Sequence, residues 1–219
     1  MKEIIRLCFV LTIIAAVSAG VLAYVNDKTA EPIARALLEE KMSAVRSVLP
    51  PYENEPDKDM VTIALEGDES LEVYRGRKDG VVTGAAFSIT APDGYSGDIV
   101  FMIGVDGKGV MQGLMVLTHL ETPGLGAKIE SEDFRGQYKG KSLENPGLWE
   151  VTKDGGTFVP ITGATISSRA ITRAAARGLK LFAEHKAEIF DTGAGSGNTE
   201  AEVDSATVEE DDVEGEVEQ

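Results

Sequence analysis

One short run of small residues carries the hydroxyl groups best suited to covalent chemistry in this chain. Thr162-Gly163-Ala164-Thr165 stands directly before a segment with helical periodicity. A threonine hydroxyl is barely acidic, so Thr165 becomes a phosphate ester only if another group removes its proton and a good leaving group departs. The chain has two histidines, His119 and His185, and no local set of residues for that task. Thr165 therefore has the character of an acceptor modified by a separate enzyme, and its small neighbours leave room for that enzyme.

The helix expected after Thr165 adds an electrostatic reason for a phosphate at this position. Free N–H groups and the dipole at a helix N-terminus favour an anion. Arg169, Arg173 and Arg177 recur every four residues and form one stripe along that helix. Arg169, one turn in, is placed to reach a phosphate, and the other two would face water or a partner. An ordinary loop with a helix cap is the alternative, because threonine is a good cap residue and four small residues are a weak signal.

Two other stretches have the composition of ligand-binding loops. His119-Leu120-Glu121-Thr122-Pro123-Gly124-Leu125-Gly126 follows a strand-like run, and Pro92-Asp93-Gly94-Tyr95-Ser96-Gly97 is a glycine-rich turn with one aromatic residue. His119 and Glu121 would suit a proton-transfer pair or metal ligands. Two residues do not make a metal site, and we expect them to hold the shape of the loop. Tyr95 would lie near a bound ligand or, alternatively, cover a sheet edge.

These motifs together resemble the FMN-binding domain found in the G subunit of the Rnf electron-transport complex and in the related C subunit of the sodium-translocating NADH:quinone reductase. Residues 119–126 match the H-x-E-T-P-G-L-G loop of the Rnf family, and residues 162–165 match its (S/T)-G-A-T flavinylation motif. The resemblance implies that a separate flavin transferase, using FAD and a divalent cation, attaches FMN to Thr165 through a phosphoester bond. Val159 stands where targets of the transferase usually have an acidic residue. This departure concerns recognition by the transferase, and leaves Thr165 as the residue to be modified.

The resemblance also implies which side chains hold the flavin. Thr122 would hydrogen-bond the ring edge, Leu125 would cover a ring face, and Gly126 would permit close approach of the backbone. No catalytic residue and no metal ligand are expected. The remaining residues of the expected site are Tyr95, Glu121, Thr162, Gly163, Ala164 and Arg169.

As a whole, the resemblance implies an electron-transfer subunit of a membrane-bound, ion-translocating ferredoxin:NAD oxidoreductase. Such a subunit relays electrons and has no independent catalytic site. Its partners would be the other membrane subunits of the complex and, during maturation, the flavin transferase. The alternatives are a component like the C subunit of the sodium-translocating NADH:quinone reductase, an FMN domain that serves a separate reductase, and a cofactor-free extracytoplasmic binding module.

The negative charge of the chain is concentrated at its C-terminal end. The formal net charge of the 219 residues is −16, and residues 200–219 contain ten acidic residues without any lysine or arginine, which leaves −6 for the rest. This composition predicts a disordered acidic tail over residues 191–219 and argues against nucleic acid as a partner. The lone cysteine, Cys8, excludes an internal disulfide.

An uncharged, mostly apolar run near the N-terminus predicts a membrane anchor over residues 1–28. It extends over 19 residues from Leu7 to Val25, close to the roughly 20 that a spanning helix requires. Lys2 and Arg6 precede it and favour a cytoplasmic N-terminus. We therefore expect a single pass through the inner membrane, with the domain on the periplasmic or extracytoplasmic side. A cleavable signal peptide is the alternative.

Residues 29–59 predict an amphipathic helix followed by a linker. Pro32 suits the first turn of this helix, and Pro50-Pro51 would end it. An apolar stripe at helical spacing is expected to pack on the following domain. The stripe consists of Ile33, Leu37, Leu38, Met42, Val45 and Val48.

Residues 60–190 predict the FMN-binding domain, so the fold class is α+β, with an antiparallel or mixed sheet and flanking helices. Asp79-Gly80 and Asp106-Gly107 are strong hairpin signals between strand-like runs. The expected strands are 61–65, 71–75, 81–90, 99–105 and 110–118. Further expected elements are a short helix over 127–138, strands over 149–152 and 157–161, and a helix over 166–184.

Overall fold

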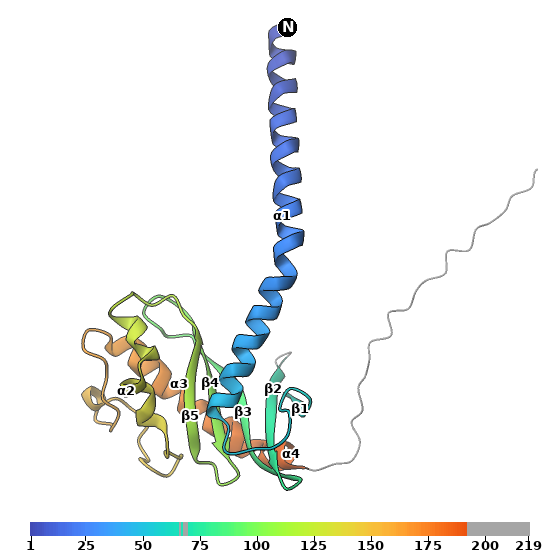
Figure 1. Ribbon diagram of the computed structural model, residues 1–219. Coiled ribbons are helices and arrows are strands. Elements are labelled where there is room, and N and C mark those ends of the chain that lie inside the picture. Colours follow the sequence, from blue (N-terminus) through green and yellow to red (C-terminus); the bar gives the residue numbers. More distant parts are fainter. Residues whose placement is uncertain (66, 68–69, 192–219) are drawn as a thin grey trace, which may run out of the picture.

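A long N-terminal helix stands away from a domain built on a single sheet (Figure 1). The computed structural model describes residues 1–65, 67 and 70–191, so the predicted acidic tail lies outside the described residues from residue 192 onward. The predicted α+β fold, an N-terminal apolar helix followed by an antiparallel sheet with flanking helices, is confirmed.

Helix α1 runs without interruption from Lys2 to Val48 and, at 1.5 Å per residue, is about 70 Å long. It is the one helix among the described residues that is long and apolar enough to cross a membrane. The predicted anchor and the predicted amphipathic helix are parts of this one element, and Pro32 lies inside it rather than in the first turn of a second helix. No glycine lies between Val25 and Pro32.

The prediction that the whole apolar stripe packs on the domain is wrong. Met42, Val45 and Val48 are buried, whereas Ile33, Leu37 and Leu38 are more than half exposed. Helix α1 leads away from the sheet toward its N-terminal end (Figure 1), and its first buried residue is Met42. The earlier apolar residues therefore have no surface of the described domain to cover.

The sheet is a five-stranded antiparallel meander in which the spatial order follows the sequence order. Asp79 and Gly80 join β2 to β3 with φ angles of 51° and 77°, and a positive φ at both central residues is typical of a tight hairpin turn. Asp106 is the last residue of β4, and Gly107 begins the turn that leads into β5, so both predicted hairpins are confirmed. The strands are β1 (Met60–Ala64), β2 (Ser70–Lys78), β3 (Val81–Ala91), β4 (Ile99–Asp106) and β5 (Met111–Thr118).

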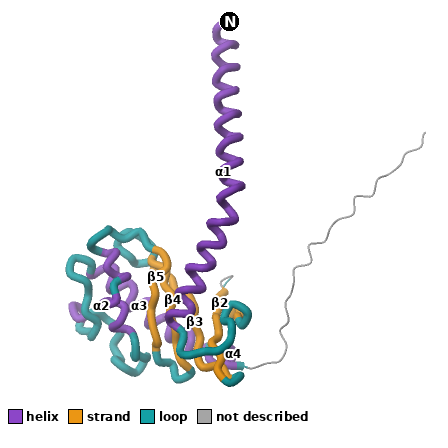
Figure 2. The backbone as a smooth tube through the Cα atoms, in the orientation of Figure 1, coloured by secondary structure: helices purple, strands orange, loops and turns teal. Residues whose placement is uncertain are grey.

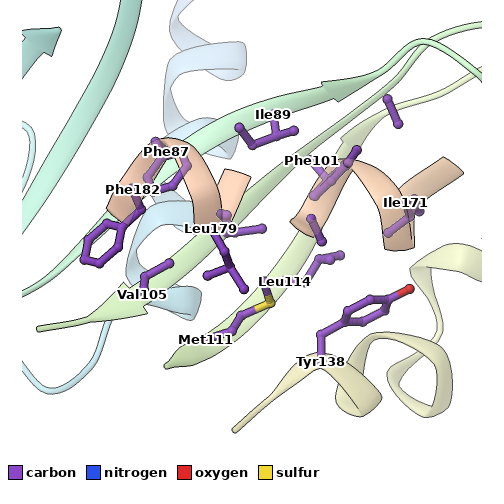
Figure 3. Close-up of a cluster of buried hydrophobic side chains, with 14 of the residues drawn as sticks. Phe87, Ile89, Phe101, Val105, Met111, Leu114, Tyr138, Ile171, Leu179 and Phe182 are labelled. Atoms are coloured by element: carbon purple, nitrogen blue, oxygen red, sulfur yellow. The ribbon is translucent and has the colours of Figure 1, made fainter. Parts of the chain in front are cut away.

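Helix α3 (Thr165–Glu184) covers one face of the sheet and the last turns of α1 cover the other. Because successive side chains of a strand point to opposite faces of the sheet, neighbouring residues pack in different hydrophobic clusters. Phe87 belongs to the cluster under α3, while Ala86 belongs to the cluster under α1. In the α3 cluster, the Phe87 and Phe182 rings stack with their centroids 6.5 Å apart (Figure 3). This packing fixes α3 against the sheet.

The chain between β5 and α3 is mostly loop with short helical turns, and it lies beside β5 (Figure 2). The helix predicted over 127–138 is broken into η1 (Gly126–Glu130), α2 (Glu132–Arg135) and η2 (Gly136–Tyr138). Another short turn, η3 (Thr152–Asp154), precedes α3, and α4 (Lys186–Phe190) follows it.

The strands predicted over 149–152 and 157–161 are wrong. One isolated bridge, between Val151 and Phe158, is the β structure in this region of the described chain. Trp149 and Phe158 instead pack as rings, 5.0 Å apart, and Phe158 lies 4.8 Å from the Tyr138 ring. Apolar residues here are buried by aromatic packing, which needs no hydrogen-bonded ladder.

Candidate functional site

A cavity of about 530 Å³ opens at the N-terminal end of α3, within the ~300–1,000 Å³ range of small-molecule sites. Three segments that are distant in sequence form its wall: the turn at Tyr95, the loop of residues 121–126, and the start of α3. A fourth contribution comes from η3. The residues that line it are Tyr95, Glu121, Thr122, Leu125, Gly126, Lys153, Gly163, Ala164, Thr165, Ile166 and Ser167.

The Thr165 hydroxyl does not cap a helix. Helix α3 begins at Thr165 itself, its N-cap residue is Ala164, and no side-chain hydrogen bond caps it. Thr165 Oγ1 instead accepts a hydrogen bond from Lys153 Nζ at 2.9 Å. The helix-cap alternative for this motif is therefore wrong, and the hydroxyl lies at the wall of the cavity.

Gly163 has a structural reason to be glycine. Its φ is +84°, a left-handed conformation that side chains disfavour, and a Cβ there would lie 3.1 Å from Leu125 Cδ2. Any larger residue at 163 would push against Leu125. The motif and the 121–126 loop thus contact each other directly, although about forty residues separate them in the sequence.

Glu121 ties the segments of the site together. Its side chain is buried, with the whole residue 5 % exposed. Oε1 accepts hydrogen bonds from the backbone N–H groups of Tyr95 at 2.7 Å and Ser96 at 3.2 Å, and Oε2 accepts one from Ser167 Oγ at 2.8 Å. The close fit extends to Gly126, where an added Cβ would lie 2.9 Å from Glu121 Cβ.

His119 supports the same loop from outside the cavity. Its Nδ1 accepts a hydrogen bond from the Glu121 backbone N–H at 3.1 Å, and its Nε2 lies 3.0 Å from Glu130 Oε1. Both residues of the predicted pair therefore hold the shape of the loop, as expected. Over residues 1–65, 67 and 70–191, no group of three His, Cys, Asp or Glu residues is arranged to hold a metal ion.

The outer wall of the cavity is apolar and exposed. Tyr95 is 68 % exposed, Leu125 47 % and Ile166 46 %, and all three line the cavity. Exposed apolar side chains around a concave site suit a flat aromatic ligand, which would bury them on binding. The polar groups of Thr122 and Thr165 lie in the same wall, so the cavity offers an apolar surface with a few polar anchors.

The structure brings together eight of the ten predicted site residues and leaves two outside. Thr162 is exposed and does not line the cavity, and neither does Arg169. Arg169 instead forms a two-contact ion pair with Asp154, at 2.5 Å and 3.0 Å. This guanidinium holds the pKa of the Asp154 carboxyl below its ordinary value.

The rest of the arginine stripe is likewise engaged within the domain. Arg173 binds the Glu150 carboxylate at 2.9 Å and 3.1 Å, and Arg177 donates to the Thr90 carbonyl at 3.2 Å. Arg173 and Arg177 were expected to face water or a partner, and both are exposed while also making these contacts. Arg169 and Arg173 hold the segment around η3 against α3.

Sequence reasoning missed Lys153, Ile166 and Ser167 as residues of the cavity. Ile166 and Ser167 lie in the first turn of α3, so their nearness to Thr165 along the chain was a usable signal. Lys153 precedes Thr165 by twelve residues in an irregular segment. No periodicity in the sequence marks that contact.

The FMN-binding domain family model matches residues 94–180, a range that includes every residue lining the cavity. Two relatives carry the name of the G subunit of an ion-translocating oxidoreductase complex. The protein from Cereibacter sphaeroides is 39 % identical over 180 residues, covering 80 % of this chain and 82 % of its own length. The protein from Pseudomonas aeruginosa is 36 % identical over 199 residues, covering 86 % and 93 %.

A solved structure shares the fold. The C subunit of the Na⁺-translocating NADH-quinone reductase from Parabacteroides distasonis aligns with a TM-score of 0.51 at 18 % identity, over 73 % of this chain and 96 % of its own. The fold and the family match together define a protein with an FMN-binding domain behind an N-terminal helix that is able to span a membrane. More particularly, the chain belongs to the G-subunit family of ion-translocating oxidoreductase complexes, the Rnf family that its motifs predicted.

Proposed function

We propose that this chain is the electron-transfer subunit of a membrane-bound, ion-translocating ferredoxin:NAD oxidoreductase complex and carries FMN covalently on Thr165. The observation that supports this most directly is the position of the Thr165 hydroxyl. It lies at the wall of a cavity of ligand size, at the first residue of α3, and takes no part in capping that helix. An esterified phosphate suits this place, because helix N-termini favour anions.

The residues around the cavity fit the two chemically different parts of FMN. The exposed apolar side chains of Tyr95, Leu125 and Ile166 suit the ring system, and Thr122 suits its polar edge. The first turn of α3 suits the phosphate. Bound FMN would supply the acceptance and release of electrons. The protein would contribute binding, orientation and partial exclusion of water.

Attachment would depend on a separate flavin transferase. In a balanced transfer, Thr165 Oγ1 forms a bond to the phosphorus atom on the FMN side of FAD, the P–O bond to AMP breaks, and AMP leaves. The hydroxyl proton passes to a base of the transferase. Thr165 is partly exposed, which leaves it accessible to such an enzyme.

Helix α1 would anchor the protein next to the other membrane subunits of the complex. Lys2 and Arg6 precede its apolar part, which favours a cytoplasmic N-terminus and an FMN domain on the periplasmic or extracytoplasmic side. A covalent tether suits that location, since FMN lost there would not readily be replaced.

The test is the mass of the chain made with and without a flavin transferase. After denaturation, we expect the wild-type protein from transferase-containing cells to gain the mass of one FMN less one water and to fluoresce in a gel. Thr165→Val should abolish both signals. Thr118→Val is the matched control, since Thr118 is exposed, outside the cavity and outside the flavinylation motif, and it should retain them. A wild-type chain that stays unmodified and colourless would support a cofactor-free binding module instead.

A further inference from the structure

Lys153 is the one cation among the described residues that line the cavity. Its Nζ donates to Thr165 Oγ1 at 2.9 Å. An ammonium group gains more from an anionic acceptor than from a neutral hydroxyl, and it lies next to the oxygen that the proposed ester would use. Lys153 therefore brings the one positive charge in the described cavity wall into contact with Thr165 Oγ1, the atom that would form the ester.

The surrounding ion pairs hold Lys153 at this place. Its neighbour Asp154 is bound by Arg169, and Glu150, three residues before Lys153, is bound by Arg173. Both arginines belong to α3, one turn apart, so they fasten the segment around η3 to the helix that begins with Thr165. They also engage the two nearest carboxylates along the chain, which would otherwise compete for the Lys153 ammonium.

Close packing within residues 150–156 restricts the backbone conformation around η3. Gly156 packs so closely on the Glu150 backbone that an added Cβ would clash with it. Gly155 ends η3 with a φ of 87°, which a residue with a side chain adopts only with strain. The position of Lys153 therefore follows from the local fold and not from its own long side chain alone.

We propose that Lys153 is the charge-stabilising and positioning residue for FMN attachment, and that its ammonium then neutralises the negative charge of the phosphodiester on Thr165. This inference rests on the proposed function, because it concerns the same bond. A protonated lysine cannot take the hydroxyl proton, so Lys153 acts through its charge. It stabilises the negative charge that develops on Oγ1 as the hydroxyl proton passes to a base of the transferase, and then the negative charge of the neighbouring phosphoryl oxygens as the bond to phosphorus forms and the bond to AMP breaks.

The first test measures the initial rate of flavinylation of the purified full-length chain by a transferase with FAD and Mg²⁺. Lys153→Met should slow attachment about tenfold or more, because a hydrogen bond to a charged group is lost. Lys153→Arg should retain most of the rate, as expected for a role of charge. Lys128→Met is the matched control, an exposed lysine outside the cavity wall, and should match the wild type. An unchanged initial rate for Lys153→Met would overturn the proposal.

The second test uses binding without any covalent step. In a Thr165→Val chain, which cannot form the ester, we compare the affinities of FMN and riboflavin, which differ only in the phosphate. FMN should bind about tenfold more tightly, and most of this difference should be lost in the Thr165→Val, Lys153→Met double variant and with added salt. Equal affinities for the two flavins in both proteins, or the same difference in both, would refute a phosphate-binding role for Lys153.

These tests separate the two proposals. If the wild-type chain gains no FMN from an active transferase, attachment at Thr165 fails, and the comparison of FMN with riboflavin still decides the role of Lys153. If the wild type is modified and Lys153→Met is modified at the same rate, the attachment proposal stands and the role of Lys153 in it falls.

Discussion

The Glu121 carboxylate accepts a hydrogen bond from the Ser167 hydroxyl at 2.8 Å, across 46 residues of sequence. This buried contact joins the 121–126 loop to the first turn of α3, and the other oxygen of the same carboxylate holds the turn at Tyr95. One side chain thus fixes the relative positions of the three segments that make most of the cavity. The shape of the site therefore depends on the hydrogen bonds that the Glu121 carboxylate accepts within the protein.

Removal of this carboxylate should destabilise the domain. Glu121→Ala would leave the N–H groups of Tyr95 and Ser96 without their acceptor, at a cost of roughly 1–3 kcal/mol in the free energy of unfolding. Glu121→Gln should cost less, since an amide can still accept from Tyr95 and donate to Ser167. Urea unfolding of the detergent-solubilised chain measures both.

Glu55→Ala is the control for this series. Glu55 pairs with Lys58 three residues along, their side chains are 65 % and 75 % exposed, and exposed pairs of this kind contribute little. It should leave the stability nearly unchanged. Equal stability of Glu121→Ala and wild type would show that the three segments are held by other contacts.

A second prediction concerns the contact of α1 with the sheet. A Cβ at Gly104 would collide with the backbone of Val48, while a Cβ at Gly113 would lie 3.3 Å from Val48 Cα. Gly104→Ala should therefore cost about 1–3 kcal/mol or more through overpacking, and Gly113→Ala clearly less. Thermal unfolding of both variants checks the order. The reverse order would mean that Val48 does not rest on β4.

A third prediction concerns acid. Asp59 lies just before β1 and forms ion pairs with Arg75 and Arg77 of β2. Desolvation of the Asp59 carboxyl would raise its pKa, but hydrogen bonds from Arg77 and Arg75 outweigh this effect and hold the pKa below its ordinary value. A depressed pKa in the folded state means that the carboxylate stabilises the fold above its unfolded pKa of about 3.9. That contribution is lost as the pH falls through the folded-state pKa.

Asp59→Asn should therefore be less stable than wild type at pH 7, and the difference should narrow as the pH falls below about 4. Urea unfolding at several pH values measures this. Asp57→Asn is the control, because Asp57 is exposed, and it should change stability little. A difference between Asp59→Asn and wild type that stays constant down to about pH 2 would contradict the role given to the two arginines.

Short-range pattern was enough to predict the sheet. Each of the five strands was placed to within a few residues, because alternating apolar residues and Asp-Gly turns act on neighbouring backbone. The same kind of pattern gave a wrong prediction for residues 149–161, where Trp149 and Phe158 are buried by packing of their rings against each other. An apolar run by itself does not distinguish a paired strand from a loop whose side chains are buried by packing.

For helix α1 as well, the sequence predicted the local structure but not the tertiary contacts. The sequence predicted helical periodicity and an apolar stripe, both of which are local properties. How much of that stripe meets the domain depends on the angle at which α1 leaves the sheet, and that angle follows from the contact of Val48 with the glycines of β4 and β5.

By itself, the sequence determined the threonine motif, the glycine-rich loop, the strands and the family, since all of these reside in neighbouring residues. The tertiary structure alone decided that Arg169 binds Asp154, that Lys153 contacts Thr165 and that Glu121 joins three segments. The physical reason is that a charged or polar side chain binds whichever complementary groups lie within contact distance in space, however far apart they are in the sequence. Those distances are set by the packing of α3 and the loops against the sheet, which no short stretch of the chain encodes.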